Sequence, residues 1–169
     1  MTDETQTPLE AEKPRKLTVE EKRQMKSTSR LYAVQALFQM EAAGQGLDRV
    51  RMEFLNHRFG AVYEGEEMAD GNGPLFERIL EDAVKYQGKI DQATDRALLA
   101  AWPIDRIDPV LRAVFRAAGA ELSTPATPPK VVINEFVDVA RAFFPTGKEP
   151  KFVNAVLDHM AREFRPEAF

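Results

Sequence analysis

The chain has 169 residues, 44% of them hydrophobic and 30% charged, so it can bury one hydrophobic core and is too short for two large domains. Its formal net charge of -4 argues against a protein that coats nucleic acid indiscriminately, because such binding depends on a large positive field. The sequence has no cysteine, which excludes disulfides, thiolate zinc sites and cysteine nucleophiles. This composition is consistent with the cytoplasm, where we expect the protein to act.

The first 25 residues are polar and contain too few large apolar side chains to join a core, which predicts a mostly disordered tail. Helical structure could still begin near Thr18. The tail lacks the apolar segment of a signal peptide, and no later stretch has the length and apolarity of a membrane span. We therefore expect one helical domain over residues 26–169 and no association with a membrane.

Apolar residues recur at helical spacing in six segments, most of them bounded by glycine or proline. The expected helices cover residues 27–43 (ended by Gly44), 47–59 (ended by Gly60), about 74–101 (with a break near Gly88, ended by Trp102-Pro103), a stretch from 109 onwards, one marked by apolar residues between 132 and 143, and one marked between 153 and 160. Asp108 is suited to cap the fourth helix, and Pro109 to occupy its first position.

Two further segments bear on the fold class. An acidic, glycine-bearing loop is expected between Gly60 and Gly73. The run 131–133 is the one segment that favours a strand, but a single short run without a partner makes no sheet. The sequence therefore predicts an all-α fold.

Catalytic and metal-binding patterns are absent from the sequence. His57 and His159 lie on different expected helices without metal-ligand spacing. Thr146-Gly147-Lys148 lacks the remainder of a phosphate-binding loop, and residues 70–73 lack the ligands of a calcium loop. We expect a non-enzymatic protein with no metal and no cofactor.

Basic residues mark the start of the first helix. Lys22, Lys26 and Arg30 are spaced by four, so they share a face if the helix extends upstream, and hydroxyl residues at 27–29 lie between them. Cations and hydroxyls at a helix start can hold phosphates. The alternative is a solvated charged face, and the pattern alone favours that alternative.

A second basic segment precedes the last helix. Lys148 and Lys151 could hold phosphates, and Phe152 could stack on an unpaired base. Alternatively, Phe152 belongs to the core or staples its helix. Arg112 and Arg116 lie one turn apart, and they could face solvent, pair with Asp105 or Asp108, or extend the basic surface.

Several segments between residues 30 and 157 resemble, in order and spacing, the NusB family of bacterial transcription antitermination factors. The matching segments are Arg30 with residues 33–41, Trp102 with Arg106, residues 111–122, residues 129–135 with Val137 and Ala140, residues 151–154, and residues 156–158. The resemblance implies two packed three-helix bundles. It also implies an RNA-binding adaptor that pairs with the ribosomal protein NusE on boxA RNA of nascent ribosomal transcripts, within an RNA polymerase elongation complex containing other Nus factors.

The resemblance also implies roles for individual residues. Those expected to contact RNA are Lys22, Lys26, Arg30, Arg116, Lys148, Lys151 and Phe152. Glu81, Asp105 and Asp108 would suit a basic ribosomal partner, although solvation explains these acids equally well. Asn134, Glu135 and Asn154 match recurring family positions, and they are expected to cap helices or bond between them.

The sequence also departs from the family pattern. Residues 26–30 read Lys-Ser-Thr-Ser-Arg where many relatives carry an arginine run, and Ala120 stands where tyrosine is common. Fewer cations predict weaker intrinsic RNA affinity and greater dependence on the partner. The alternative function is a helical protein-interaction module, or one that associates into a homodimer, without specific RNA binding.

Overall fold

The computed structural model describes residues 16–59, 62–63, 66–67, 71–98 and 104–169. Within this part of the chain, seven α-helices form the fold: α1 (Val19–Ala43), α2 (Leu47–His57), α3 (Gly73–Lys85), α4 (Gln87–Ala97), α5 (Pro109–Leu122), α6 (Pro129–Phe143) and α7 (Glu149–Phe164). Two short 3-10 turns, η1 (Ile104–Arg106) and η2 (Pro166–Ala168), and a two-residue antiparallel pair, β1 (Val62–Tyr63) with β2 (Glu66–Glu67), complete it. None of the described helices is both long and apolar enough to cross a bilayer.

Several helix ends follow the capping residues that the sequence indicates. Gly44 ends α1 in the left-handed conformation, with φ of 63°. The side chain of Asp108 accepts a hydrogen bond from the amide of Val110 at 2.7 Å, and Pro109 is the first residue of α5. These predicted boundaries are confirmed.

α1 begins at Val19, where the Thr18 hydroxyl accepts from the amide of Glu21, so helical structure starts near Thr18, as the sequence allowed, and includes residues 19–25. Another boundary differs from the prediction. The long third helix divides at Tyr86 into α3 and α4, two residues before the predicted glycine. Residues 1–15 and the predicted Trp102-Pro103 stop lie outside the described residues. The run 131–133 lies within α6.

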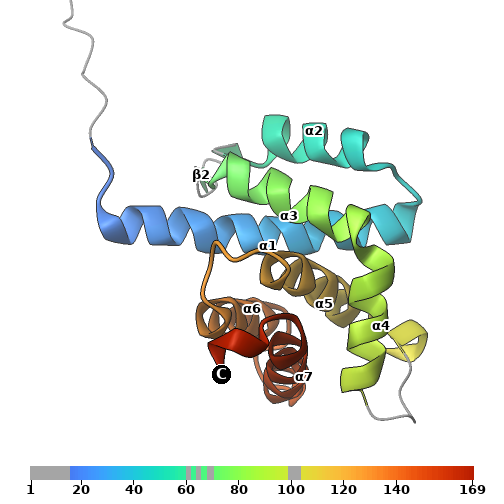
Figure 1. Ribbon diagram of the computed structural model, residues 1–169. Helices are drawn as coiled ribbons and strands as arrows, with labels where there is room; N and C mark the ends of the chain where they lie inside the picture. The colour runs from blue at the N-terminus through green and yellow to red at the C-terminus, as the bar shows by residue number, and fades with distance from the viewer. Residues whose placement is uncertain (1–15, 60–61, 64–65, 68–70, 99–103) are drawn as a thin grey trace, which may run out of the picture.

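The helices form two packed groups (Figure 1). α2 and α3 pack against α1, while α5, α6 and α7 lie on the other side of α1, and α4 connects the groups at the right of the view. α5 contacts helices of both groups, so the core is continuous. The all-α prediction is confirmed, and the second group has four helices because the expected third helix divides.

Aromatic packing holds the first group together, and close helix approach marks the second. Phe54 and Phe76 stack with ring centroids 5.7 Å apart, and Tyr32 meets Phe54 edge to face. In the second group, a Cβ added to Gly119 of α5 would lie 2.5 Å from a methyl of Ile90 in α4. The absence of a side chain at Gly119 therefore lets these two helices approach closely.

Candidate nucleic-acid interface

Two neighbouring grooves run along α6, and many of the polar residues considered for RNA binding line them. Arg23, Ser27 and Thr28 line the first, which we call the α1–α6 groove. Arg141, Lys148 and Lys151 line the second, the α6–α7 groove. Asn134 and Asp138 line both grooves, so the two form one polar surface across α6.

The predicted lysines are exposed in two places. Lys148 and Lys151 lie at the start of α7, where they line the α6–α7 groove beside Arg141. Lys22 and Lys26 are exposed on the first turns of α1. The sequence prediction did not include Arg141, which joins the cations of α7 only because α6 and α7 pack side by side.

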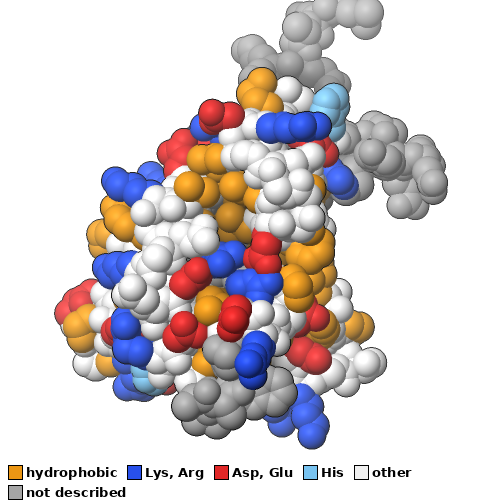
Figure 2. Space-filling view, turned by 90° about the vertical axis from the view of Figure 1, so that its right-hand side faces the viewer, with side chains coloured by type: hydrophobic (Ala, Val, Ile, Leu, Met, Phe, Trp, Pro, Cys, Tyr) orange, Lys and Arg blue, Asp and Glu red, His pale blue; other side chains and the backbone are white. Residues whose placement is uncertain are grey.

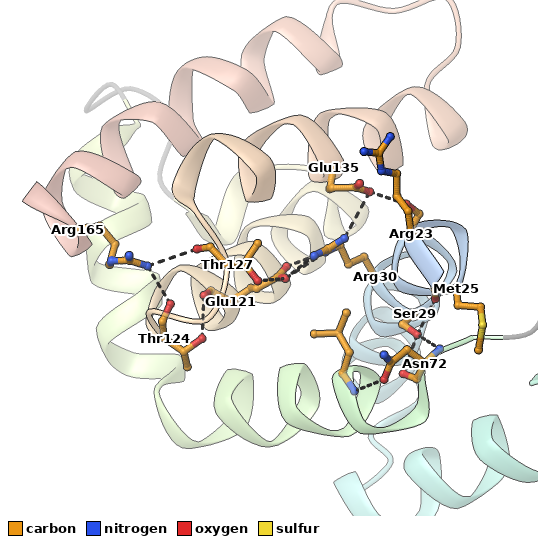
Figure 3. A network of polar contacts seen from close by, with 12 residues as sticks. Arg23, Met25, Ser29, Arg30, Asn72, Glu121, Thr124, Thr127, Glu135 and Arg165 are labelled. Atoms are coloured by element: carbon orange, nitrogen blue, oxygen red, sulfur yellow. Dashed lines mark hydrogen bonds and ion pairs between the residues drawn. The ribbon is translucent and has the colours of Figure 1, made fainter. Parts of the chain in front are cut away.

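The sequence predicted that Arg30 contacts RNA, but the residue is buried, with only 3% of it exposed. Its guanidinium donates to Glu121 of α5 from Nε at 2.9 Å and from Nη2 at 2.7 Å, and Nη1 lies 3.5 Å from a carboxylate oxygen of Glu135 in α6 (Figure 3). Helical residues spaced by four drift by about 40° at each step, so Arg30 is turned by about 80° from Lys22 and faces α5 and α6. We therefore correct its role to a buried ion pair between helices.

The electrostatics of Arg30 agree with this role. Burial works against the charged form, but the hydrogen bonds and charge of Glu121, together with the charge of Glu135, hold the pKa of Arg30 above its usual value. Thr127 donates a further hydrogen bond to Glu121 at 3.2 Å. Arg30 is thus a charged anchor that joins α1 to both α5 and α6.

Two of the three hydroxyls predicted at the start of α1 are also engaged within the protein. Ser29 is buried and bonds with the backbone of Asn72, donating to its carbonyl at 2.7 Å and accepting from its amide. Ser27 donates to Glu135 at 2.7 Å. The Ser29 contacts fix the start of α3, and the Ser27 contact joins α1 to α6 at the α1–α6 groove. Lys22 and Lys26 remain as the exposed cations predicted on α1.

Arg112 and Arg116 lie on another part of the surface, with Glu41 of α1 and Asp91 of α4. Arg116 donates to Glu41 at 2.8 Å and to Asp91 at 2.9 Å, rather than to Asp105 or Asp108. Figure 2 shows acidic and basic side chains side by side on this face. The hydrogen bond from Arg112, followed by the charges of both arginines, lowers the pKa of Glu41. The guanidinium of Arg116 is already paired with acids, and Arg116 does not line either α6 groove.

The sequence left two roles open for Phe152, stacking on an unpaired base or packing in the core, and the residue is partly exposed and partly packed. Its side chain is 37% exposed, and its ring meets Phe115 edge to face with centroids 5.9 Å apart. One part of the ring is therefore packed on α5, while another part is open to a ligand.

The predicted partner-binding acids have separate local roles. Glu81 lies 3.3 Å from Arg51 of α2, Asp108 caps α5, and Asp105 is exposed in η1. Beside Asp108, Val110 lines an apolar groove with Val34, Phe38, Ala42, Phe54 and Phe143. Phe38, one of the apolar residues of α1, is 38% exposed at this groove.

Asn134 and Asn154 depart from the capping or bonding role that was expected. Both are exposed and line the α6–α7 groove, and neither amide makes a side-chain hydrogen bond within the described residues. Glu135 does bond between helices, as expected, through Ser27 and Arg30. The four-residue spacing of Asn134 and Asp138 was the signal in the sequence that could have placed both on the polar face of α6.

Metal-ligand geometry is not found among the described residues, in which no group of three or more histidine or acidic side chains is arranged to hold an ion. His57 and His159 are both exposed and lie on separate helices. The two α6 grooves present charged and amide side chains, which can bind phosphates and base edges.

Comparisons with a family model, with related sequences and with solved structures all match NusB proteins. The NusB family model matches residues 27–162. The transcription antitermination protein NusB of Granulibacter bethesdensis is 45% identical over 150 residues, covering 85% of this chain and 91% of the relative, and that of Maricaulis maris is 42% identical over 89% of this chain and 94% of the relative.

Solved structures of the same family share the fold. T. maritima NusB matches with a TM-score of 0.68 at 27% identity, covering 83% of this chain and 93% of that one. A chain from a crystal structure of antitermination factors NusB and NusE in complex with dsRNA matches with a TM-score of 0.61 at 22% identity, covering 81% and 96%.

Proposed function

The chain belongs to the NusB family, and on that basis we propose that it is a non-enzymatic RNA-binding adaptor in transcription antitermination. The observation that carries the proposal is the cluster at the start of α7. There Lys148, Lys151 and Phe152 are exposed together, and the two lysines share a groove with Arg141. This combination of cations and an open aromatic ring suits a single-stranded RNA.

The RNA backbone and the bases would engage different parts of this surface. Lys148 and Lys151 would hold phosphates, and the open part of Phe152 would stack on one base. Lys22 and Lys26 would extend phosphate binding to the start of α1. We propose boxA RNA of nascent ribosomal transcripts as the ligand, because the family resemblance implies it.

The charge distribution supports a conditional binder. The net charge of -4 provides no general attraction for RNA, and Arg30, Arg112 and Arg116 are engaged by carboxylates within the protein. These three arginines therefore add little to the attraction of RNA, and phosphate binding would rest on the exposed lysines at the starts of α1 and α7. We propose that stable RNA binding requires NusE, the partner present in the related NusB–NusE–dsRNA structure, and that the complex acts with RNA polymerase and other Nus factors.

The partner would dock on the apolar groove that contains Phe38. Phe38 is 38% exposed there and lines the groove with Val34, Phe54 and Phe143, so it extends a contiguous apolar surface that a partner can cover. Asp108 lies two residues from Val110 of this groove, and Asp105 and Glu81 are exposed acids on neighbouring elements. The apolar centre suits an apolar segment of the partner, whereas the acids lie outside the groove, whose charged lining residue is Arg58.

The test is fluorescence anisotropy with boxA RNA and a scrambled RNA of the same composition, each with and without NusE. We expect NusE to strengthen binding of boxA RNA selectively. Lys151→Ala should weaken binding and reduce the slope of log affinity against log salt by about 0.7, as for one lost single-strand phosphate contact. The control Lys85→Ala removes an exposed lysine of α3 that lies over Tyr86, outside both grooves, and should leave the slope unchanged.

Two outcomes would refute the proposal. Equal binding of boxA and scrambled RNA in all mixtures would show that the protein does not recognise a specific RNA. Binding of NusE without binding of any RNA would instead support the protein-interaction module. Phe38→Asp should abolish the effect of NusE while preserving the weak binding of RNA alone, because Phe38 lines neither α6 groove.

A further inference from the structure

The α6–α7 groove contains side chains that phosphate binding does not explain. Between its cations lie Asn134 and Asp138 of α6 and Asn154 of α7. All three are exposed, and the two α6 residues are one turn apart, so they lie on one helix face. Neutral amides can bond phosphate oxygens but add no charge that attracts them, and a carboxylate repels them, so the place of Asp138 in the groove requires another explanation.

The two asparagine amides are free to meet a ligand. Neither makes a side-chain hydrogen bond within the described residues. Each amide offers an acceptor oxygen and a donor NH2, the combination that pairs with the edge of a nucleobase. They lie on the two helices that line the groove, so a base bound in the groove has an amide on each of the two helices beside it.

Asp138 is the most informative of the three. Its carboxylate pairs with Arg141 at 2.7 Å, but both side chains are more than 60% exposed, and exposed pairs at this spacing contribute little stability. A carboxylate beside Lys148 and Lys151 repels phosphate and thereby lowers non-specific RNA affinity. It therefore discriminates against RNA that provides no compensating contact.

The chemistry of the carboxylate defines that compensating contact. An ionised aspartate only accepts hydrogen bonds, so it matches bases that present an amino group, such as N4 of cytosine or N6 of adenine. Uracil presents the carbonyl oxygen O4 at the corresponding position, which an aspartate repels. Because the pair with Arg141 is exposed, the carboxylate stays accessible to a base in the groove.

We propose that Asp138, flanked by Asn134 and Asn154, reads base edges and selects an amino-bearing base over uracil at one position of the RNA. Lys148 and Lys151 hold the backbone and provide affinity, whereas these three residues provide sequence discrimination. This inference rests on the proposed RNA-binding function and identifies the part of the surface that makes it selective.

The experiment measures the affinity of the full chain with NusE for a set of boxA RNA variants. Each adenine, cytosine or guanine is replaced in turn by uracil, and each uracil by cytosine. For the wild type, we expect one position at which the amino-bearing base is preferred to uracil by about fivefold to 100-fold, the range of one specific base contact. Asp138→Ala should bring that ratio close to one and leave the ratios at other positions unchanged.

A second variant and a matched control strengthen the test. Asp138→Asn keeps the shape but adds a donor that can reach O4 of uracil, so the preference at the same position should shift toward uracil. The control Asp48→Ala removes an exposed aspartate of α2 that pairs with Arg51 at the same three-residue spacing. It makes the same change in charge outside both grooves, so all base ratios should remain those of the wild type.

Three results would overturn the inference. If Asp138→Ala raises affinity for every RNA by the same factor, Asp138 only repels phosphate. If all base ratios stay unchanged in both Asp138 variants, the groove does not read that base, although the RNA-binding function stands. If the wild type binds boxA and scrambled RNA equally, the proposed function fails and this inference fails with it.

Discussion

Replacing Arg30 by methionine tests whether this arginine is a structural anchor or an RNA contact. Methionine retains much of the length of the side chain and removes its charge. Glu121, which is only 4% exposed, would keep a hydrogen bond from Thr127 and lose the guanidinium. Glu135 would keep its bond with Ser27. The main consequence is therefore one uncompensated carboxylate inside the protein.

The size of the effect follows from that burial. Removing one partner of a buried ion pair destabilises a protein by about 3–5 kcal/mol, a large share of the roughly 5–15 kcal/mol that holds a domain of this size folded. The double variant Arg30→Met with Glu121→Leu removes both charges and should recover most of this loss, because an apolar pair of similar volume is often as stable as a buried ion pair.

Urea unfolding followed by circular dichroism measures both variants. Arg162→Met is the control, because Arg162 pairs with Asp158 on an exposed helix face and its loss should change the free energy of unfolding by less than about 1 kcal/mol. A loss below about 1 kcal/mol for Arg30→Met, accompanied by a reduced salt dependence of RNA binding, would refute the anchor role. It would restore Arg30 as a phosphate contact.

Three further predictions concern other sites. Phe152→Ala should weaken RNA binding by about 1–3 kcal/mol in an anisotropy titration, while thermal unfolding shows less than the roughly 3–5 kcal/mol loss of a core phenylalanine, because the ring is partly exposed. Gly119→Ala should lower the free energy of unfolding by about 1–3 kcal/mol in urea titrations, because the new methyl collides with α4; an unchanged midpoint would show that α4 yields freely. The lowered pKa of Glu41 means that its ionised form stabilises the fold above the ordinary value of about 4.5. The stability difference between wild type and Glu41→Gln should therefore be present at pH 7 and shrink as pH falls below that value, and a difference that grows in acid would contradict the pairing with Arg112.

Much of the fold could be predicted because it depends on local chemistry. Gly44, Asp108 and Pro109 mark helix ends through their own backbone and capping preferences, which neighbours in space do not change. The sequence predicted a break in the third helix near Gly88, whereas the helix divides at Tyr86. Glycine lowers helix stability wherever it occurs, whereas the bend is positioned by the way α3 and α4 pack on α5.

The site was less predictable because it depends on which helices become neighbours. Lys148 and Lys151 could be recognised from their place before the last helix, but Arg30 could not be separated from Lys26 by charge or spacing. Its burial follows from the carboxylates of Glu121 and Glu135, which are far away in the sequence. The groove residues of α6 could not be predicted for the same reason, because their function depends on α7 lying beside them.

The gain in boxA affinity on adding NusE tests the central claim most directly. The proposed conditional adaptor predicts weak binding with a shallow salt dependence by the protein alone, and a large NusE-dependent gain for boxA RNA that scrambled RNA does not share. An equal gain for both RNAs, or no gain for either, would contradict it.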